Sequence, residues 1–143
     1  MSIALRCVIL GWVLLFISCS PKISLFDQYA YTQVTSIKVD ALTVMSDAVD
    51  SFALHKNEVR AVDISIRKMI EYGRHRLNDT STIRQWEKLN DPKQHLYGGF
   101  INRWKQKNKL DSAFVTDQQY IIARAFDQIA ELESGKIKPS DIK

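Results

Sequence analysis

The residue types that most often carry chemistry are sparse and scattered in this chain of 143 residues. Its three histidines, His55, His75 and His95, fall in different predicted elements, and none has the HExxH spacing or another metal-ligand spacing. The sequence contains no GxSxG motif, no CxxCH haem-attachment motif and no Gly-rich phosphate loop. We therefore expect no metal and no cofactor, and we interpret the histidines as solvated or capping residues.

Carboxylates are the next candidates for catalysis. Asp40, Asp47 and Asp50 share the polar side of the first predicted helix, and Asp47 and Asp50 have i, i+3 spacing. A pair of carboxylates works as general acid and base only where its surroundings raise the pKa of one member. The neighbouring residues, such as Thr43 and Ser46, are typical of a solvated helix face. We expect these carboxylates to have no catalytic role.

The most distinctive internal stretch combines aromatic and basic residues around Gly98-Gly99, with no acidic residue between Asp91 and Asp111. The aromatic residues either line a groove for a ligand or partner, or fill the core where a helix kinks. The basic residues either rest on anionic lipid headgroups, pair with acids of the first helix, or are simply solvated. The candidate interaction surface consists of Trp86, Tyr97, Phe100, Arg103, Trp104, Lys105, Lys107 and Lys109.

Helical periodicity dominates the elements that must position these residues. Over 25–54, apolar residues recur at steps of three and four, and Ser24 with Asp27 approximates a capping box. A second helix follows with Asn57 as its expected N-cap, and we favour a break before it over one continuous rod. The apolar positions of the first helix are Phe26, Ala30, Val34, Ile37, Ala41, Val44, Ala48 and Phe52.

The rest of the chain predicts a divided third element and a final helix. Ser81 caps a short helix over 83–89, Asp91-Pro92 starts the next segment, and Gly98-Gly99 breaks the pattern before Phe100. For the final helix, Thr116 is the expected N-cap with Gln119 three residues later, Val115 and Tyr120 form a hydrophobic staple, and Gly135 ends it. We predict an all-α, four-helix-bundle-like domain over 25–134, with a broken third element and an unstructured polar tail over 135–143.

The N-terminus predicts export. Arg6 precedes an apolar run of about eleven residues, 7–17, which is too short to span a membrane, and Ser18-Cys19 closes it. This segment resembles the signal of bacterial lipoproteins, although Phe16 stands where that family usually has Leu. The resemblance implies a signal peptide over 1–18, a lipid on Cys19 and a tether over 19–24. Ser20, where inner-membrane lipoproteins often have Asp, implies the outer membrane.

Composition limits the function further. The net charge of +4 falls to +3 once Arg6 is removed, which is no nucleic-acid signature. The two cysteines are Cys7, inside the signal, and Cys19, so the folded part has no thiol for a disulfide. The mature part resembles small exported helical proteins, a resemblance that implies no activity. We expect a membrane-anchored, non-enzymatic helical module with an envelope protein partner; the alternative is a periplasmic small-ligand binder or enzyme that uses an aromatic groove.

Overall fold

The computed structural model describes residues 26–76 and 80–142, and within these ranges the protein is all-α, as expected. The predicted signal peptide, Cys19 and the Ser24 cap lie outside the described residues. No strand occurs in the described ranges. The helices are α2 (Gln28–Ser46), α3 (Lys56–Arg74), α4 (Thr80–Asn90), α5 (Tyr97–Lys107) and α6 (Ser112–Glu133), with 3-10 turns η1 (Asp47–Val49), η2 (Phe52–Leu54) and η3 (Pro139–Asp141).

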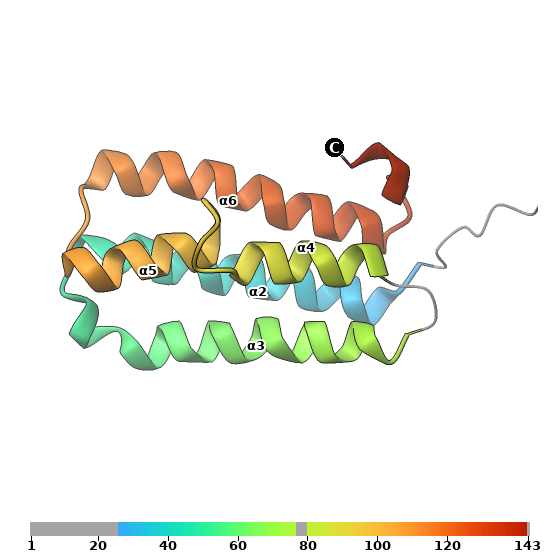
Figure 1. Ribbon diagram of the computed structural model, residues 1–143, viewed down its shortest axis with the longest axis horizontal. Helices are drawn as coiled ribbons and strands as arrows, with labels where there is room; N and C mark the ends of the chain where they lie inside the picture. Colours follow the sequence, from blue (N-terminus) through green and yellow to red (C-terminus); the bar gives the residue numbers. More distant parts are fainter. Residues whose placement is uncertain (1–25, 77–79, 143) are drawn as a thin grey trace, which may run out of the picture.

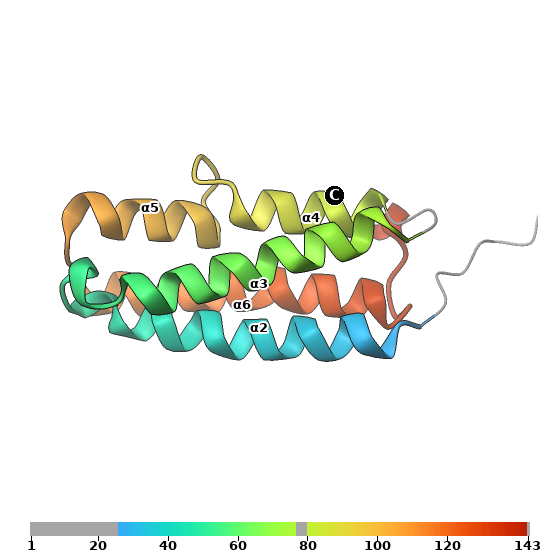
Figure 2. The ribbon, with the colours of Figure 1, turned by 90° about the horizontal axis from the view of Figure 1, so that it is seen from below.

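The helices lie side by side along one long axis. α2, α3 and α6 each run most of its length, whereas α4 and α5 follow one another along the remaining side (Figures 1 and 2). At one end, here named the Asp27 end, α2 and α4 begin and α3 and α6 stop. At the opposite end, named the Asn108 end, α2 and α5 stop and α3 and α6 begin.

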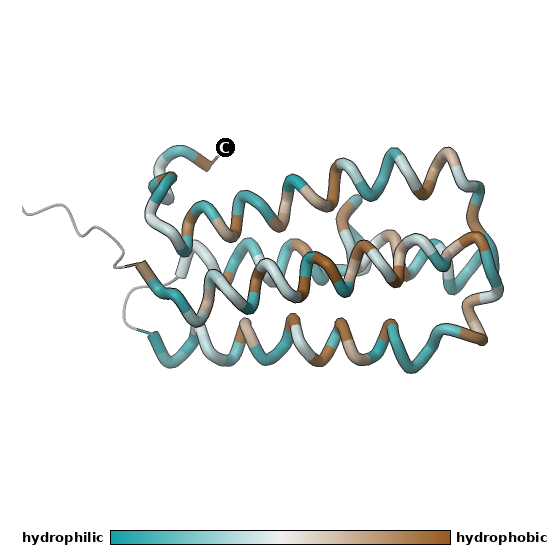
Figure 3. Tube along the Cα trace, turned by 180° about the vertical axis from the view of Figure 1, so that it is seen from behind, coloured by the Kyte–Doolittle hydropathy of each residue, from teal (hydrophilic) through white to brown (hydrophobic). Residues whose placement is uncertain are grey.

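The apolar stripe of α2 forms the centre of the core. The side chain of Asp27 caps this helix by accepting a hydrogen bond from the Ala30 amide at 2.9 Å. Apolar and polar positions alternate along each helix with the helical period (Figure 3). Of the residues predicted for the stripe, Phe26 is 57% exposed and is therefore not part of the core. The buried members are Ala30, Val34, Ile37, Ala41, Val44 and Ala48.

The break between the first two helices is confirmed, but it comes earlier than predicted. α2 ends at Ser46, and the N-cap of α3 is His55 rather than Asn57. Between them, the Phe52 amide donates to the Asn108 carbonyl at 2.9 Å, and the Leu110 amide donates to the Ala48 carbonyl at 2.8 Å. These bonds to a distant segment hold residues 47–54 in short 3-10 turns, because they divert backbone groups that a continuous helix would use.

The glycine pair does not break a helix, contrary to expectation. Gly98 and Gly99 lie in the first turn of α5, and the break between α4 and α5 is the preceding segment, 91–96, so Pro92 does not begin a helix. The end of α4 approaches α5 so closely that a Cβ on Gly98 would collide with the Asn90 carbonyl. A Cβ on Gly99 would collide with the carbonyl of Gln94. The glycines are therefore needed for close backbone approach.

The predicted caps of α4 and α6 are wrong. Ser81 lies inside α4, and Thr116 lies inside α6, where its hydroxyl donates to the Ser112 carbonyl at 3.0 Å. The actual N-cap of α6 is Asp111, whose carboxylate accepts from two amides of the first turn. Tyr120 is 68% exposed, so it forms no staple with Val115.

The C-terminal end of α6 follows the prediction more closely. Gly135 follows the C-cap with φ 70°, as expected of a glycine that terminates a helix. The tail contains η3, so it is not wholly irregular as predicted.

Replacing Ile37 with Asp tests this core. Ile37 is 3% exposed, so we expect the buried, unpaired carboxylate to lower the free energy of unfolding by several kcal/mol, about 3 or more. Val39→Asp is the matched control, because Val39 lies on the same helix but is 63% exposed, and its effect should stay within about 0.5 kcal/mol. Urea unfolding followed by circular dichroism measures both variants. Equal losses in the two variants would contradict the assignment of the core.

Candidate functional site

The four aromatic residues of the predicted interaction surface are buried. Trp86, Tyr97, Phe100 and Trp104 are each at most 3% exposed. The Trp86 ring meets Phe126 of α6 edge-on, with ring centroids 5.9 Å apart. These side chains therefore belong to the core and do not line a groove open to solvent. Of the two interpretations that the sequence left open, core packing is the one that the structure shows.

Trp104 anchors the Asn108 end. Its indole Nε1 donates to the carbonyl of Asp50 at 3.0 Å and to that of Asn108 at 3.1 Å. Phe52 packs edge-on against the same ring at 5.3 Å, and the His55 ring lies 5.7 Å away. Because the indole donates to both carbonyls, it links the segment between α2 and α3, which contains Asp50, to Asn108 at the end of α5.

Trp86 and Tyr97 each carry a buried polar atom without a partner. Neither the indole Nε1 of Trp86 nor the hydroxyl of Tyr97 has a hydrogen-bond partner among the described residues. Burial, together with the charge of Asp63, raises the pKa of Tyr97 far above its usual value. The Tyr97 hydroxyl thus stays protonated at physiological pH and is unsuited to act as a base.

The four basic residues of the predicted surface are exposed and gather at the Asn108 end. We name Arg103, Lys105, Lys107 and Lys109 the basic cluster. The Arg103 guanidinium lies 4.3 Å from the centre of the Phe114 ring, a cation–π contact. Lys105 and Lys107 lie in the last turn of α5, where the helix dipole favours cations. None of the four forms an ion pair with a described carboxylate, so the proposed pairing with acids of the first helix is absent.

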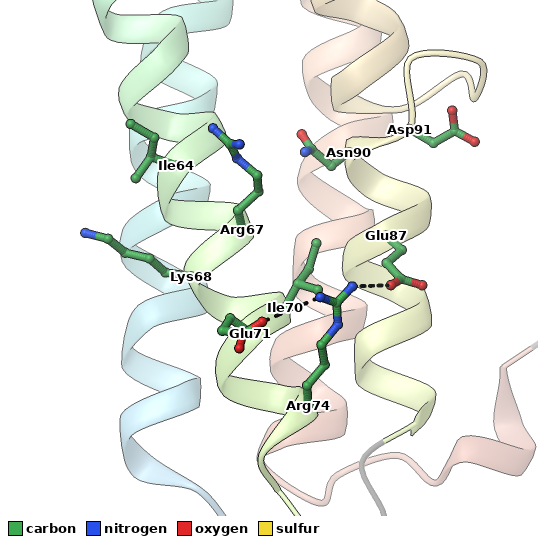
Figure 4. Close-up of a pocket in the computed structure, with 9 residues that line it drawn as sticks. All are labelled: Ile64, Arg67, Lys68, Ile70, Glu71, Arg74, Glu87, Asn90 and Asp91. Atoms are coloured by element: carbon green, nitrogen blue, oxygen red, sulfur yellow. Dashed lines mark hydrogen bonds and ion pairs between the residues drawn. The ribbon is translucent and has the colours of Figure 1, made fainter.

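An open groove of about 650 Å³ lies between α3 and α4, and the sequence did not predict it (Figure 4). Its arginines already have carboxylate partners: Arg74 contacts Glu71 at 3.5 Å and Glu87 at 3.3 Å. Arg67 likewise contacts Asp63 at 2.8 Å, a pair whose i, i+4 spacing was visible in the sequence. Both guanidinium groups are therefore compensated by carboxylates and are not free for an anionic ligand.

Buried and partly buried charges meet at the Asp27 end. The Arg76 guanidinium lies 2.7 Å from the carboxylate of Glu133 and 3.3 Å from that of Asp27, and the Tyr72 hydroxyl donates to Asp27 at 2.8 Å. Glu133 is only 2% exposed. We name these four residues the Arg76 cluster. Its ionic groups and the Tyr72 hydroxyl contact one another, and this geometry is that of a structural contact.

Metal and membrane-spanning features are equally absent from the described part of the chain. No group of three or more His, Cys, Asp or Glu in residues 26–76 and 80–142 is placed to hold a metal ion. His55 lies 3.7 Å from Asp47, and His75 lies 3.1 Å from Glu71. Over the same ranges, no helix has the length and apolar character needed to cross a bilayer.

Comparison with known proteins adds no assignment, since no family model, curated protein or solved structure matches the chain.

The Arg76 cluster predicts a pH dependence of stability. Burial raises the pKa of Asp27, but hydrogen bonds from the Ala30 amide and the Tyr72 hydroxyl, with the charge of Arg76, outweigh burial and leave it below its usual value. The folded state therefore gains stability above the unfolded pKa of about 3.9 and loses it as the pH falls through the lower folded pKa.

Asp27→Asn removes this charge but keeps a side chain that caps helices well. We expect the variant to be less stable than the wild type at neutral pH, and the difference to shrink on acidification towards about pH 2. Urea titrations across this range measure it, with the exposed Asp117→Asn as control. A difference that did not change with pH would show that the Asp27 charge is not what stabilises this end.

Proposed function

We propose that this protein is a lipid-anchored, non-enzymatic interaction module of the bacterial cell envelope, folded as a four-helix bundle whose third position is shared by α4 and α5. One observation carries the proposal. The basic cluster is exposed and has no carboxylate partner among the described residues, and it lies at the end of the helices opposite to the Asp27 end, where the described chain begins at residue 26.

The lengths of the elements support this arrangement. The seven residues from Cys19 to Leu25 extend at most about 25 Å, whereas α2 alone is about 28 Å long. The tether keeps the Asp27 end within about 25 Å of the membrane, and a bundle that stands upright there directs the basic cluster away from it. We therefore favour an anionic surface on an envelope protein as the partner, in place of the headgroups around the anchor.

The alternative, a small-ligand binder or enzyme with an aromatic groove, loses its basis because Trp86, Tyr97, Phe100 and Trp104 are buried. An envelope location, with the outer membrane favoured by Ser20, stays part of the proposal. An acyl anchor fits it, because two or three acyl chains, at about 0.8 kcal/mol per buried CH₂, hold a protein firmly at a bilayer.

Cys19→Ala tests the anchor. We expect the variant to accumulate as an unprocessed precursor without lipid, because the acyl acceptor is gone. Cys7→Ala is the matched control, since Cys7 lies inside the signal and should be dispensable. Mass spectrometry of the protein from membrane and soluble fractions measures both. Identical mature masses for the wild type and Cys19→Ala would refute lipidation.

Reversing the basic cluster tests the partner surface. We expect the change of Arg103, Lys105, Lys107 and Lys109 to Glu to abolish a crosslinked envelope partner in intact cells, while circular dichroism stays helical. The control reverses four exposed cations on other faces, Arg60, Lys68, Lys88 and Arg124, with the same change in net charge. If both variants kept the partner, or both lost it, the assignment of the interaction to the basic cluster would fail.

A further inference from the structure

Three aromatic side chains are exposed at the Asp27 end. Phe26 is 57%, Tyr29 54% and Tyr31 39% exposed, and we name them the terminal aromatic group. The rings of Phe26 and Tyr31 are 6.1 Å apart, and Tyr29 packs on Tyr72 of α3 at 5.0 Å. The group therefore lies around the first turn of α2, and exposed rings that gather at one end of a helix are candidates for an interaction surface.

Rings of this kind suit the interface of a bilayer. Tyrosine has an apolar ring and a polar hydroxyl, and it is enriched where membrane meets water. The group is also close to the proposed membrane anchor. Phe26 lies seven residues after Cys19, so the chain between them spans at most about 25 Å.

Charge contributes little to this surface. Arg74 contacts Glu71 and Glu87, and Lys136 contacts Glu131 at 2.7 Å. Arg76 is likewise paired within the Arg76 cluster. Arg74, Arg76 and Lys136 thus have carboxylate partners, whereas Arg84, Lys138 and the basic cluster at the Asn108 end have none among the described residues. Contact with a membrane here would depend on the aromatic rings and only weakly on anionic lipid.

We propose that Phe26, Tyr29 and Tyr31 lie in the headgroup region of the membrane that holds Cys19, and so stand the bundle end-on with the basic cluster pointing away. This inference rests on the proposed anchoring at Cys19. Its occupant is a lipid surface, identified by the exposed aromatic rings and by the short chain between them and the anchor.

The test uses the full chain, processed and lipidated in cells, then placed in vesicles. Once Cys7 is removed and Cys19 acylated, the protein has no free thiol, so one introduced cysteine takes one environment-sensitive dye. The labelled positions are the exposed residues Gln28 at the Asp27 end, Val39 in the middle of α2 and Lys107 at the Asn108 end. The vesicles are phosphatidylcholine alone, or phosphatidylethanolamine with phosphatidylglycerol.

We expect the dye at Gln28→Cys to shift its emission to the blue and to be quenched by quencher-bearing lipids, equally in both kinds of vesicle. The dyes at Val39→Cys and Lys107→Cys should emit as in water. Adding Phe26→Ser, Tyr29→Ser and Tyr31→Ser to Gln28→Cys should abolish the blue shift while the protein still floats with the vesicles. If this variant does not fold, the comparison of the dyes at positions 28, 39 and 107 in the otherwise native chain tests whether only the Asp27 end contacts lipid.

The other outcomes are separable. A protein that does not float with the vesicles overturns the anchor, and with it both proposals. A protein that floats, but whose dye at position 28 emits as in water, overturns only the aromatic contact. Blue shifts at all three positions indicate a bundle lying flat and overturn the end-on arrangement. A shift that requires phosphatidylglycerol indicates binding by charge and overturns the role of the rings.

Discussion

The Arg76 guanidinium fixes where the helices meet at the Asp27 end. It follows α3 and contacts Asp27, which caps α2, and Glu133, the last residue of α6. The Asp27 amide also donates to the Glu133 carbonyl at 3.2 Å. A buried ion pair is costly to break, because removing one partner leaves an uncompensated charge. These contacts hold the beginning of α2 and the ends of α3 and α6 together, and they fix Asp27 at this end of the molecule.

The two ends of the molecule differ in which aromatic rings are exposed and in how their charged side chains are paired. At the Asp27 end Arg74, Arg76 and Lys136 are paired with carboxylates, and Tyr29 and its neighbours are exposed. At the Asn108 end the Trp104 ring is buried, and the cations around Lys107 have no carboxylate partners among the described residues. This polarity supports a module held to a membrane at one end and available to a partner at the other.

Local periodicity predicted the helices well, and their ends poorly. The stripe from Ala30 to Ala48 follows from spacing alone, because a helix must bury its apolar face. Thr116 and Gln119 fit a capping box, yet Gln119 donates to the Leu42 carbonyl on α2 at 2.8 Å. Its partner is 77 residues away in sequence, so no local pattern could have revealed it. The contacts of Arg76 were hidden for the same reason.

The aromatic residues of the candidate interaction surface are buried, and the sequence already contained the reason. Tyr97, Phe100 and Trp104 have helical spacing, so on one helix they share a face, and that face is buried. Lys105 and Lys107 fall on the remaining surface of the same helix. The aromatic and basic residues are neighbours in the sequence, but the helix places them on different faces. Because the buried rings hold α5 against the core, its charged face is presented on a fixed backbone, which favours recognition by position as well as by charge.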